Sequence, residues 1–403
     1  MKKSSICLAV LMALPALASA QSSVTLYGLV DSGLTFVNNT GKGHVVEADT
    51  CGPPSCNLWG LKGKEDLGGG TSAIFTLENG FNIQNGKLGQ GGTEFGRQAF
   101  VGLANDQWGT VTLGRQYDPP SLTVGYFPSS NNFATGYGSH FGDLDNLNQS
   151  IRFNNAVKYV SPTWGGLHVE GMFSLGGVAG NFSTNRVWSL AAAYNRGPFA
   201  VAAGYLDIQN PATNAGGTGG VYASNGNYVG SLNDYVGLQD ASSMKVLTIG
   251  GSYSIGQATL ALNYSHTDLE NSQYFVINGF AGAGGGNDFK MDAYEASATY
   301  RVTPALLLGA AYIYNAGKAD YQNLKPDFQQ VNLGVTYALS KRTSLYAIAI
   351  VQKAGGDGIA PVFDADGAVV GRTAIAEIPG AGYDSAYSSS HSPSVRAIGQ
   401  IGN

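Results

Sequence analysis

Charged side chains are segregated along one part of this sequence. Residues 118–151 contain three carboxylates, at Asp118, Asp143 and Asp145, and no lysine or arginine. Basic side chains lie before and after this stretch. Positive charge that faces negative charge across a narrow passage would create a transverse field, which selects ions by sign and orients dipolar solutes. The basic candidates for such a site are Lys62, Arg97, Arg115, Arg152 and Lys158.

Side chains for covalent or metal-dependent catalysis occur in no recognisable spacing. The five histidines, at 44, 140, 168, 266 and 391, are dispersed, and no H-E-x-x-H or G-x-S-x-G motif occurs. The glycine tract at 282–286 lacks the Gly-Lys-Ser/Thr of a phosphate loop, and the segment 66–70 is better explained as a tight turn. The sequence therefore predicts no cofactor and no metal site. A catalytic set that is assembled only in three dimensions stays open as an alternative.

The first twenty residues have the three parts of a secretory signal peptide. Lys2 and Lys3 give a basic start, residues 6–17 are apolar, and Ala18-Ser19-Ala20 is a small-residue cleavage site. We expect residues 1–20 to be removed on export and residues 21–403 to form one domain. The whole chain carries 22 Lys and Arg against 27 Asp and Glu, and this excess of acidic residues argues against nucleic-acid binding.

Two cysteines remain after the predicted signal, Cys51 and Cys56, on either side of a Pro-Pro turn. In an exported protein this close pair favours a small local disulfide. A metal site is the alternative, but it needs more ligands and has only His44 nearby.

From residue 23 onward, apolar and polar residues alternate with period two, which is typical of β-strands that are buried on one face. No apolar run reaches 18 residues, which argues against a membrane-spanning helix. Sixteen alternating segments occur, near residues 23–37, 55–65, 71–84, 94–104, 108–117, 152–162, 166–176, 186–196, 198–208, 244–255, 257–268, 289–301, 304–316, 326–339, 342–353 and 382–401.

The connections between these segments alternate between short turns and long stretches rich in Gly, Asn and Ser, so that the long ones all fall at one end. This one-sidedness is typical of outer-membrane barrels. The sequence therefore predicts an all-β fold, a 16-stranded antiparallel transmembrane β-barrel, which is wide enough for an aqueous channel. Aromatic residues at segment ends are expected to form girdles at the two interfaces, with Trp108, Trp164 and Phe199 at one and Tyr117, Tyr205 and Tyr314 at the other.

Strand alternation also divides the basic candidates between the two faces. It places Arg97 with Ala99, Lys62 with Gly60, and Arg152 with Lys158, which favours the water-filled side for all three groups. Arg115 has the parity of Val111 and Leu113, so alternation does not settle its direction. For Arg97 and Arg115 the alternative is a purely structural role, in which ion pairs hold an inward-folded loop in place.

Several motifs together resemble one family, the general-diffusion porins of Gram-negative bacteria, especially those of β-proteobacteria. They cover the mature chain and are Val24-Thr-Leu-Tyr-Gly28, Leu61-Lys-Gly-Lys-Glu-Asp-Leu-Gly-Gly-Gly70, Glu94-Phe-Gly-Arg-Gln-Ala-Phe-Val-Gly-Leu103, Gly109-Thr-Val-Thr-Leu-Gly-Arg-Gln-Tyr-Asp118 and Asn154-Asn-Ala-Val-Lys-Tyr159. The resemblance implies a homotrimer in the outer membrane, in contact with its lipid, that passes ions and small hydrophilic solutes. It also implies that the third long loop, residues 118–151, folds inward, with Asp118, Asp143 and Asp145 opposite the basic wall.

Two features depart from the resembled family. Leu58 stands where its members often have an arginine, and the chain ends in Gly402-Asn403 rather than in an aromatic residue. An outer-membrane barrel enzyme and a substrate-specific porin are the alternative interpretations. The first would need catalytic residues near a strand end, and the second an aromatic slide along the lumen.

Overall fold

The computed structural model describes residues 23–37, 44–49, 57–211, 241–272, 287–320, 323–357, 359–363, 369–374 and 394–398. The predicted signal peptide of residues 1–20 and the predicted Cys51–Cys56 disulfide lie outside this part of the chain. Within it, no helix combines the length and the apolar character needed to cross a membrane.

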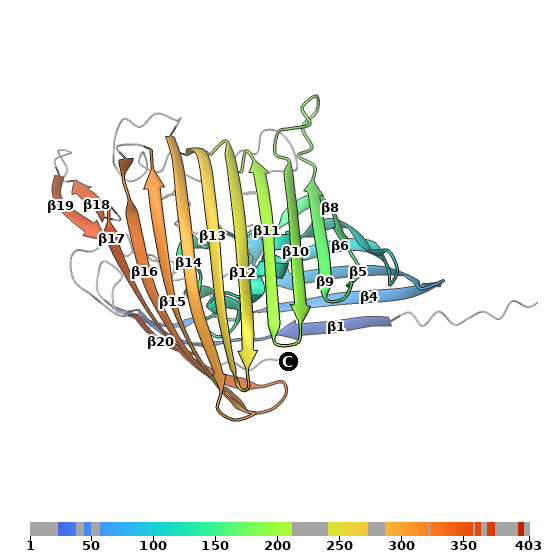
Figure 1. Cartoon of the computed structure of the whole chain (residues 1–403), viewed down its shortest axis with the longest axis horizontal. Helices are drawn as coiled ribbons and strands as arrows, with labels where there is room; N and C mark the ends of the chain where they lie inside the picture. The colour runs from blue at the N-terminus through green and yellow to red at the C-terminus, as the bar shows by residue number, and fades with distance from the viewer. Residues whose placement is uncertain are drawn as a thin grey trace, which may run out of the picture.

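Consecutive antiparallel strands form one large sheet (Figure 1). Taking β1 with β2 and β3 with β4 as interrupted strands, the described ladder has the sixteen positions that the sequence predicts. The all-β antiparallel fold is therefore confirmed. Its strands are β1(Ser23–Leu29), β2(Gly33–Val37), β3(Val45–Asp49), β4(Leu58–Gly68), β5(Thr71–Gly80), β6(Gln98–Asn105), β7(Gly109–Gln116), β8(Phe153–Val160), β9(Leu167–Ser174), β10(Val187–Arg196), β11(Phe199–Gln209), β12(Ser243–Ile255), β13(Ala258–Ser272), β14(Asn287–Arg301), β15(Leu306–Ala319), β16(Pro326–Ala338), β17(Ser344–Gly356) and β20(Ser394–Ile398).

The two ends of the ladder differ from expectation in detail. Residues 38–54, expected as a long connection, contain β3, which pairs with β2 as β4 pairs with β1. The stretch 354–381 contains a separate hairpin of β18(Ile359–Phe363) and β19(Val369–Ala374). The last segment, β20, pairs with β17 on one side and with β2 on the other.

Short turns and long connections alternate along the sheet as predicted. The turn between β10 and β11 contains Gly197 and the turn between β12 and β13 contains Gly256, with φ of 60° and 59°. Glycine adopts such left-handed conformations without the steric penalty that a Cβ atom brings. Because neighbouring strands are antiparallel, alternate connections lie at opposite ends, and the tight turns share one end of the sheet (Figure 1).

The two faces of the sheet have opposite character. On β13, Asn263, Ser265 and Thr267 are buried, while the alternating Leu262 is 67% exposed. The same alternation runs along β12 to β16, where the outward residues are large and apolar, including Leu247, Ile249, Leu333 and Val335. An outer face of large apolar residues, with polar side chains turned to the inner face, is the pattern of a barrel in lipid. At the end with the tight turns, Trp108, Trp164 and Phe199 are exposed on this outer face, as a girdle requires.

The interior holds the third long loop, which joins β7 to β8 and starts with α2(Pro119–Thr123). Asp118 caps this short helix, because its carboxylate accepts a hydrogen bond from the Ser121 amide at 3.0 Å. Most of the remaining loop is buried against the inner faces of β10 to β16, and it is seen behind β12 and β13 in Figure 1. The inward-folded loop of the prediction is thus present.

Glycines on the inner wall make room for aromatic side chains of the loop. A Cβ atom at Gly309 would lie 2.3 Å from the Phe133 ring, and one at Gly334 would lie 2.5 Å from it. Deeper along the same wall, the rings of Phe141 and Phe328 stack with their centroids 3.8 Å apart, inside a buried apolar cluster. The loop is therefore packed on this wall as a domain core is packed, rather than hanging freely in the lumen.

We expect Gly309→Val to displace the loop, because the added methyl groups occupy the space of the Phe133 ring. Overpacking of this kind costs about 1–3 kcal/mol. The variant should lose its native oligomer at a lower temperature on semi-native gels and show noisier single-channel currents. Ala310→Val is the matched control, since Ala310 is the next residue and is exposed on the outer face. Equal behaviour of the two variants would contradict this packing.

Candidate functional site at the root of the third long loop

A β-bulge turns Arg115 toward the interior. The register between β7 and β8 shifts between Gly114 and Gln116, and Gly114 has a φ of 135°. A Cβ atom at Gly114 would lie 2.2 Å from the Ala99 carbonyl oxygen, so this backbone requires glycine. Beyond the bulge, the Arg115 guanidinium donates to the Gly96 carbonyl at 2.8 Å and to the Asn154 side chain at 2.6 Å. Arg115 thus lies at an irregularity in which β8 has one residue more than β7, and simple alternation left its direction open.

Tyr117 is the centre around which the basic residues gather. Its ring lies 5.0 Å from the Arg152 guanidinium and 5.9 Å from that of Arg97, and its hydroxyl accepts a hydrogen bond from Arg152 at 3.0 Å. Its carbonyl accepts from Lys158 Nζ at 3.2 Å. These contacts join the first residue of the loop to the residues that come after its end. Tyr117 is only 2% exposed, so its predicted place in the outer aromatic girdle is wrong, because the chain has turned inward after the bulge.

Glu78 adds a carboxylate to this basic cluster. Its Oε1 accepts from Arg97 Nε at 2.7 Å, and both side chains are almost fully buried. Its Oε2 accepts from the Tyr27 hydroxyl at 2.8 Å. Lys62 lies over the other side of this group, with Nζ 5.3 Å from the Tyr27 ring, and it remains exposed. Of the five predicted basic residues, Lys62 is therefore the one in open contact with solvent.

The three loop carboxylates are engaged within the loop and with the far wall. Asp143 accepts hydrogen bonds from the Asn148 and Ser150 amides, at 2.8 and 3.1 Å. Burial and the neighbouring charge of Asp145 raise the pKa of Asp143 to about 7. Asp118 caps α2 and also accepts from Asn146 at 2.7 Å, and burial raises the pKa of its carboxyl group despite these bonds.

Asp145 points to β13 and to His140 rather than to the basic cluster. It accepts a hydrogen bond from Ser265 Oγ at 2.5 Å and pairs with His140 Nδ1 at 2.5 Å. Burial alone would raise the pKa of Asp145, but the interaction with His140 holds it below its usual range. The structure thus brings Arg97, Arg115, Arg152 and Lys158 together, and it holds the three aspartates in other contacts.

Comparison with known proteins gives the cluster its context. The model of the Gram-negative porin family matches residues 7–349. The chain belongs to the Gram-negative porins. An outer membrane porin protein of Bordetella pertussis is 32% identical, over 86% of this chain and 93% of its own length. Outer membrane porin protein 32 of Delftia acidovorans is 31% identical, over 86% of this chain and 88% of its own.

Solved structures show the same fold. An anion-selective porin from Comamonas acidovorans has a TM-score of 0.60 and 24% identity, with 83% of this chain and 90% of that one covered. The trimer form of OmpT from Vibrio cholerae has a TM-score of 0.59 and 16% identity, with 94% and 98% covered. This porin is thus a channel-forming protein of the outer membrane, and its family points away from an enzyme.

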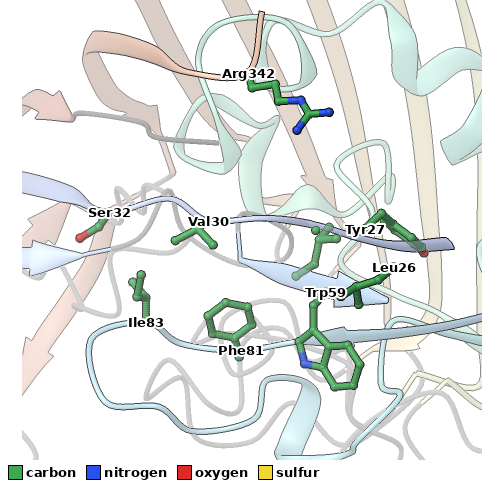
Figure 2. A pocket seen from close by; sticks show the side chains of 10 residues that line it. Leu26, Tyr27, Val30, Ser32, Trp59, Phe81, Ile83 and Arg342 are labelled. Carbon is green, nitrogen blue, oxygen red and sulfur yellow. The ribbon is translucent and has the colours of Figure 1, made fainter. Parts of the chain in front are cut away.

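A hollow of about 900 Å³ lies beside β1 and β4 of the porin and is lined mainly by apolar side chains such as Leu26, Trp59 and Ile83. Figure 2 shows Trp59 and Phe81 on one side of the β1 ribbon and the Arg342 guanidinium on the other. Arg342 is the one charged side chain among the described residues that line it. Across the described chain, no group of three His, Cys, Asp or Glu side chains could hold a metal ion.

Sequence reasoning missed the partners of the charged residues. Glu78, Tyr117, His140 and Glu295 all contact the loop or its root, yet none was a candidate. Glu78 could have been found, because it pairs with Gln98 in the β5–β6 ladder and Arg97 comes directly before that residue. Glu295 lies 155 residues from His140, and no local pattern connects them.

We expect Gly114→Ala to weaken the site, because its backbone conformation is costly for alanine and its methyl group would meet the Ala99 carbonyl. A strained residue of this kind costs about 1–3 kcal/mol. The measurement is the temperature at which the folded oligomer dissociates on gels. Gly171→Ala, on β9, is the control, because its Cβ atom would meet only one Leu190 methyl group at 3.2 Å. A Gly114→Ala protein as stable as the wild type would show that the bulge does not depend on glycine.

Proposed function

We propose that this porin is a passive diffusion channel for ions and small hydrophilic solutes, with a preference for anions. The observation that carries this proposal is the gathering of positive charge around the loop root. Four cationic side chains gather there, and Glu78 is directly paired with one of them. The oxygens of the loop aspartates accept hydrogen bonds from loop amides, Asn146, Ser265 and His140.

The cations act on a permeating ion to different extents. Arg152 is 0% exposed and Arg97 is 5% exposed, so they contribute potential from behind the wall surface and also hold Tyr117 in place. Lys62 is exposed on the same face of β4 as Gly60 and Leu58, and we propose that it meets the solute directly. Leu58 stands where the resembled porins often have an arginine, so this face carries one positive charge fewer and a weaker preference for anions. The related structure from Comamonas acidovorans, described as anion-selective, supports this sign of selectivity.

Lys62→Gln should shift the reversal potential in a salt gradient toward cations, because it removes an exposed positive charge. A unit charge a few ångströms from the ion changes the permeability ratio by about two- to fivefold in a water-filled lumen. The shift should shrink in about 1 M salt, where the Debye length is roughly 3 Å. Planar-bilayer recording measures both. Lys318→Gln is the control, since Lys318 is exposed on the outer face of β15.

Arg152→Gln distinguishes two roles of Arg152 in the same recordings, which are to act on the permeating ion through its charge and to hold the loop in place. It should give a smaller shift in reversal potential than Lys62→Gln, together with excess current noise, because it releases the Tyr117 hydroxyl. A shift without added noise would instead show that Arg152 acts only through its charge. Unchanged reversal potentials in both variants would reject the charge filter.

We also propose that the porin assembles as a homotrimer in contact with outer-membrane lipid. The solved trimer form of OmpT supports this assembly, and the apolar outer faces of β12 to β16 suit a lipid environment. The purified protein should run as a trimer on unheated SDS gels and as a monomer after boiling, with strong β-structure by circular dichroism. A folded protein that runs as a monomer before heating would contradict the trimer.

A further inference from the structure

A buried histidine lies between two carboxylates in the interior of the porin, away from the basic cluster. His140 Nδ1 is 2.5 Å from Asp145 Oδ2, and His140 Nε2 is 3.0 Å from Glu295 Oε2. Asp145 belongs to the loop and Glu295 to the inner face of β14. The exposed fractions of the three side chains are 3%, 2% and 0%.

Other donors complete the shell around the two acids. The Ser129 amide donates to Glu295 Oε1 at 2.7 Å, and Asn263 Nδ2 lies 3.4 Å from Oε2. Ser265 Oγ donates to Asp145. Both carboxylates can therefore accept as anions, and the two ring nitrogens of a protonated imidazole supply one donor to each. A neutral ring could donate to only one of them.

Two buried carboxylates on either side of a cation are stable only as a unit. A buried charge without a partner is strongly disfavoured, and removing one member of such a set exposes the others to that penalty. The unit also fixes position, because Asp145 and Ser129 are in the loop whereas Glu295, Asn263 and Ser265 are on the wall. This polar contact joins the loop to the wall, as the apolar contact of Phe133 with Gly309 and Gly334 does elsewhere in the loop.

We propose that His140, as an imidazolium bound between Asp145 and Glu295, is a positioning residue that fixes the loop to β13 and β14 and keeps both carboxylates out of the permeation path. This inference rests on the proposed anion-preferring channel for its effect on selectivity. Its effect on loop motion is independent of the sign of that preference.

We call the contact of His140 with Asp145 and Glu295 the clamp. It should stabilise the loop over a defined range of pH. Burial alone would lower the pKa of His140, but Asp145 and Glu295 raise it to about 10. A histidine with a raised pKa stabilises the fold while it is protonated, and this contribution is lost as the pH rises through about 10. Asp145, whose pKa is lowered, loses its contribution as the pH falls below the usual carboxyl range. The charged groups around His140 are Asp145 from the loop and Glu295 from β14, with Asp143 behind Asp145.

The test is His140→Gln, recorded as single channels in planar bilayers. Glutamine keeps a hydrogen-bonding side chain but cannot carry the positive charge. Relative to the wild type, we expect the population of displaced-loop states to rise by about 100-fold, seen as closures and current noise at neutral pH. The reversal potential should move toward cations as Asp145 and Glu295 reach the lumen. In the wild type, noise should rise as the pH passes about 10, whereas the variant should show no such step.

His266→Gln is the matched control. His266 also pairs with an aspartate, with Nδ1 2.8 Å from Asp292 Oδ1, but this pair is on the outer face and about one-third exposed. It should leave noise and pH profile unchanged. A His140→Gln/Glu295→Gln double variant leaves one buried carboxylate instead of two, so its currents should be quieter than those of the single variant, which also tests the contact if the single variant folds poorly.

Quiet currents in His140→Gln, or equal noise in the single and double variants, would overturn the clamp. If the wild type prefers cations, the proposed selectivity fails, but the comparison of noise between the variants still decides whether His140 holds the loop.

Discussion

The whole molecule depends on the need to pair every backbone amide and carbonyl of a chain that lies in lipid. Unpaired groups are too costly there, so neighbouring strands must pair along their whole length. Such pairing fixes a two-residue repeat and gives each strand one face toward lipid and one toward the interior. The neighbouring residues Leu262 and Asn263 illustrate this alternation, since the first is exposed on the outer face and the second is buried on the inner face. Function is confined to the inner face, since the outer face is committed to the hydrocarbon.

A wide barrel leaves an interior that strands alone cannot fill, and the third long loop fills part of it in two ways. Aromatic side chains enter hollows above glycines, and polar side chains reach across to the wall. Asn332, on β16, donates to Ser129 Oγ and to the Gly138 carbonyl, both at 2.9 Å. The result is asymmetric, because the loop is packed against β10 to β16 and is joined at its root to the residues around Tyr117. We propose that the remaining passage is bordered by the basic residues near Tyr117.

The sequence was sufficient for the periodic part of this architecture and insufficient for its exceptions. All sixteen alternating segments contain a strand in the structure, because the alternation that lipid imposes can be recognised at each residue of the sequence. The β3 strand was missed because it sits in a Gly- and Asn-rich stretch without a long repeat. Arg115 and Tyr117 were misdirected or left open because the register between β7 and β8 shifts next to Gly114, where β8 has one residue more than β7. A bulge is one residue long, and alternation has no means to detect it.

The charges show a second limit of local sequence patterns. Counting Asp143 and Asp145 with the loop suggested a negative surface, but the effect of a carboxylate on an ion depends on what already surrounds it. Two amides hold Asp143, and a histidine and a serine hold Asp145. These two carboxylates thus take part in fixing the loop, apart from the basic cluster at its root. We propose that selectivity and rigidity are linked in this porin, since the interactions that immobilise the loop also engage the carboxylates of Asp143 and Asp145.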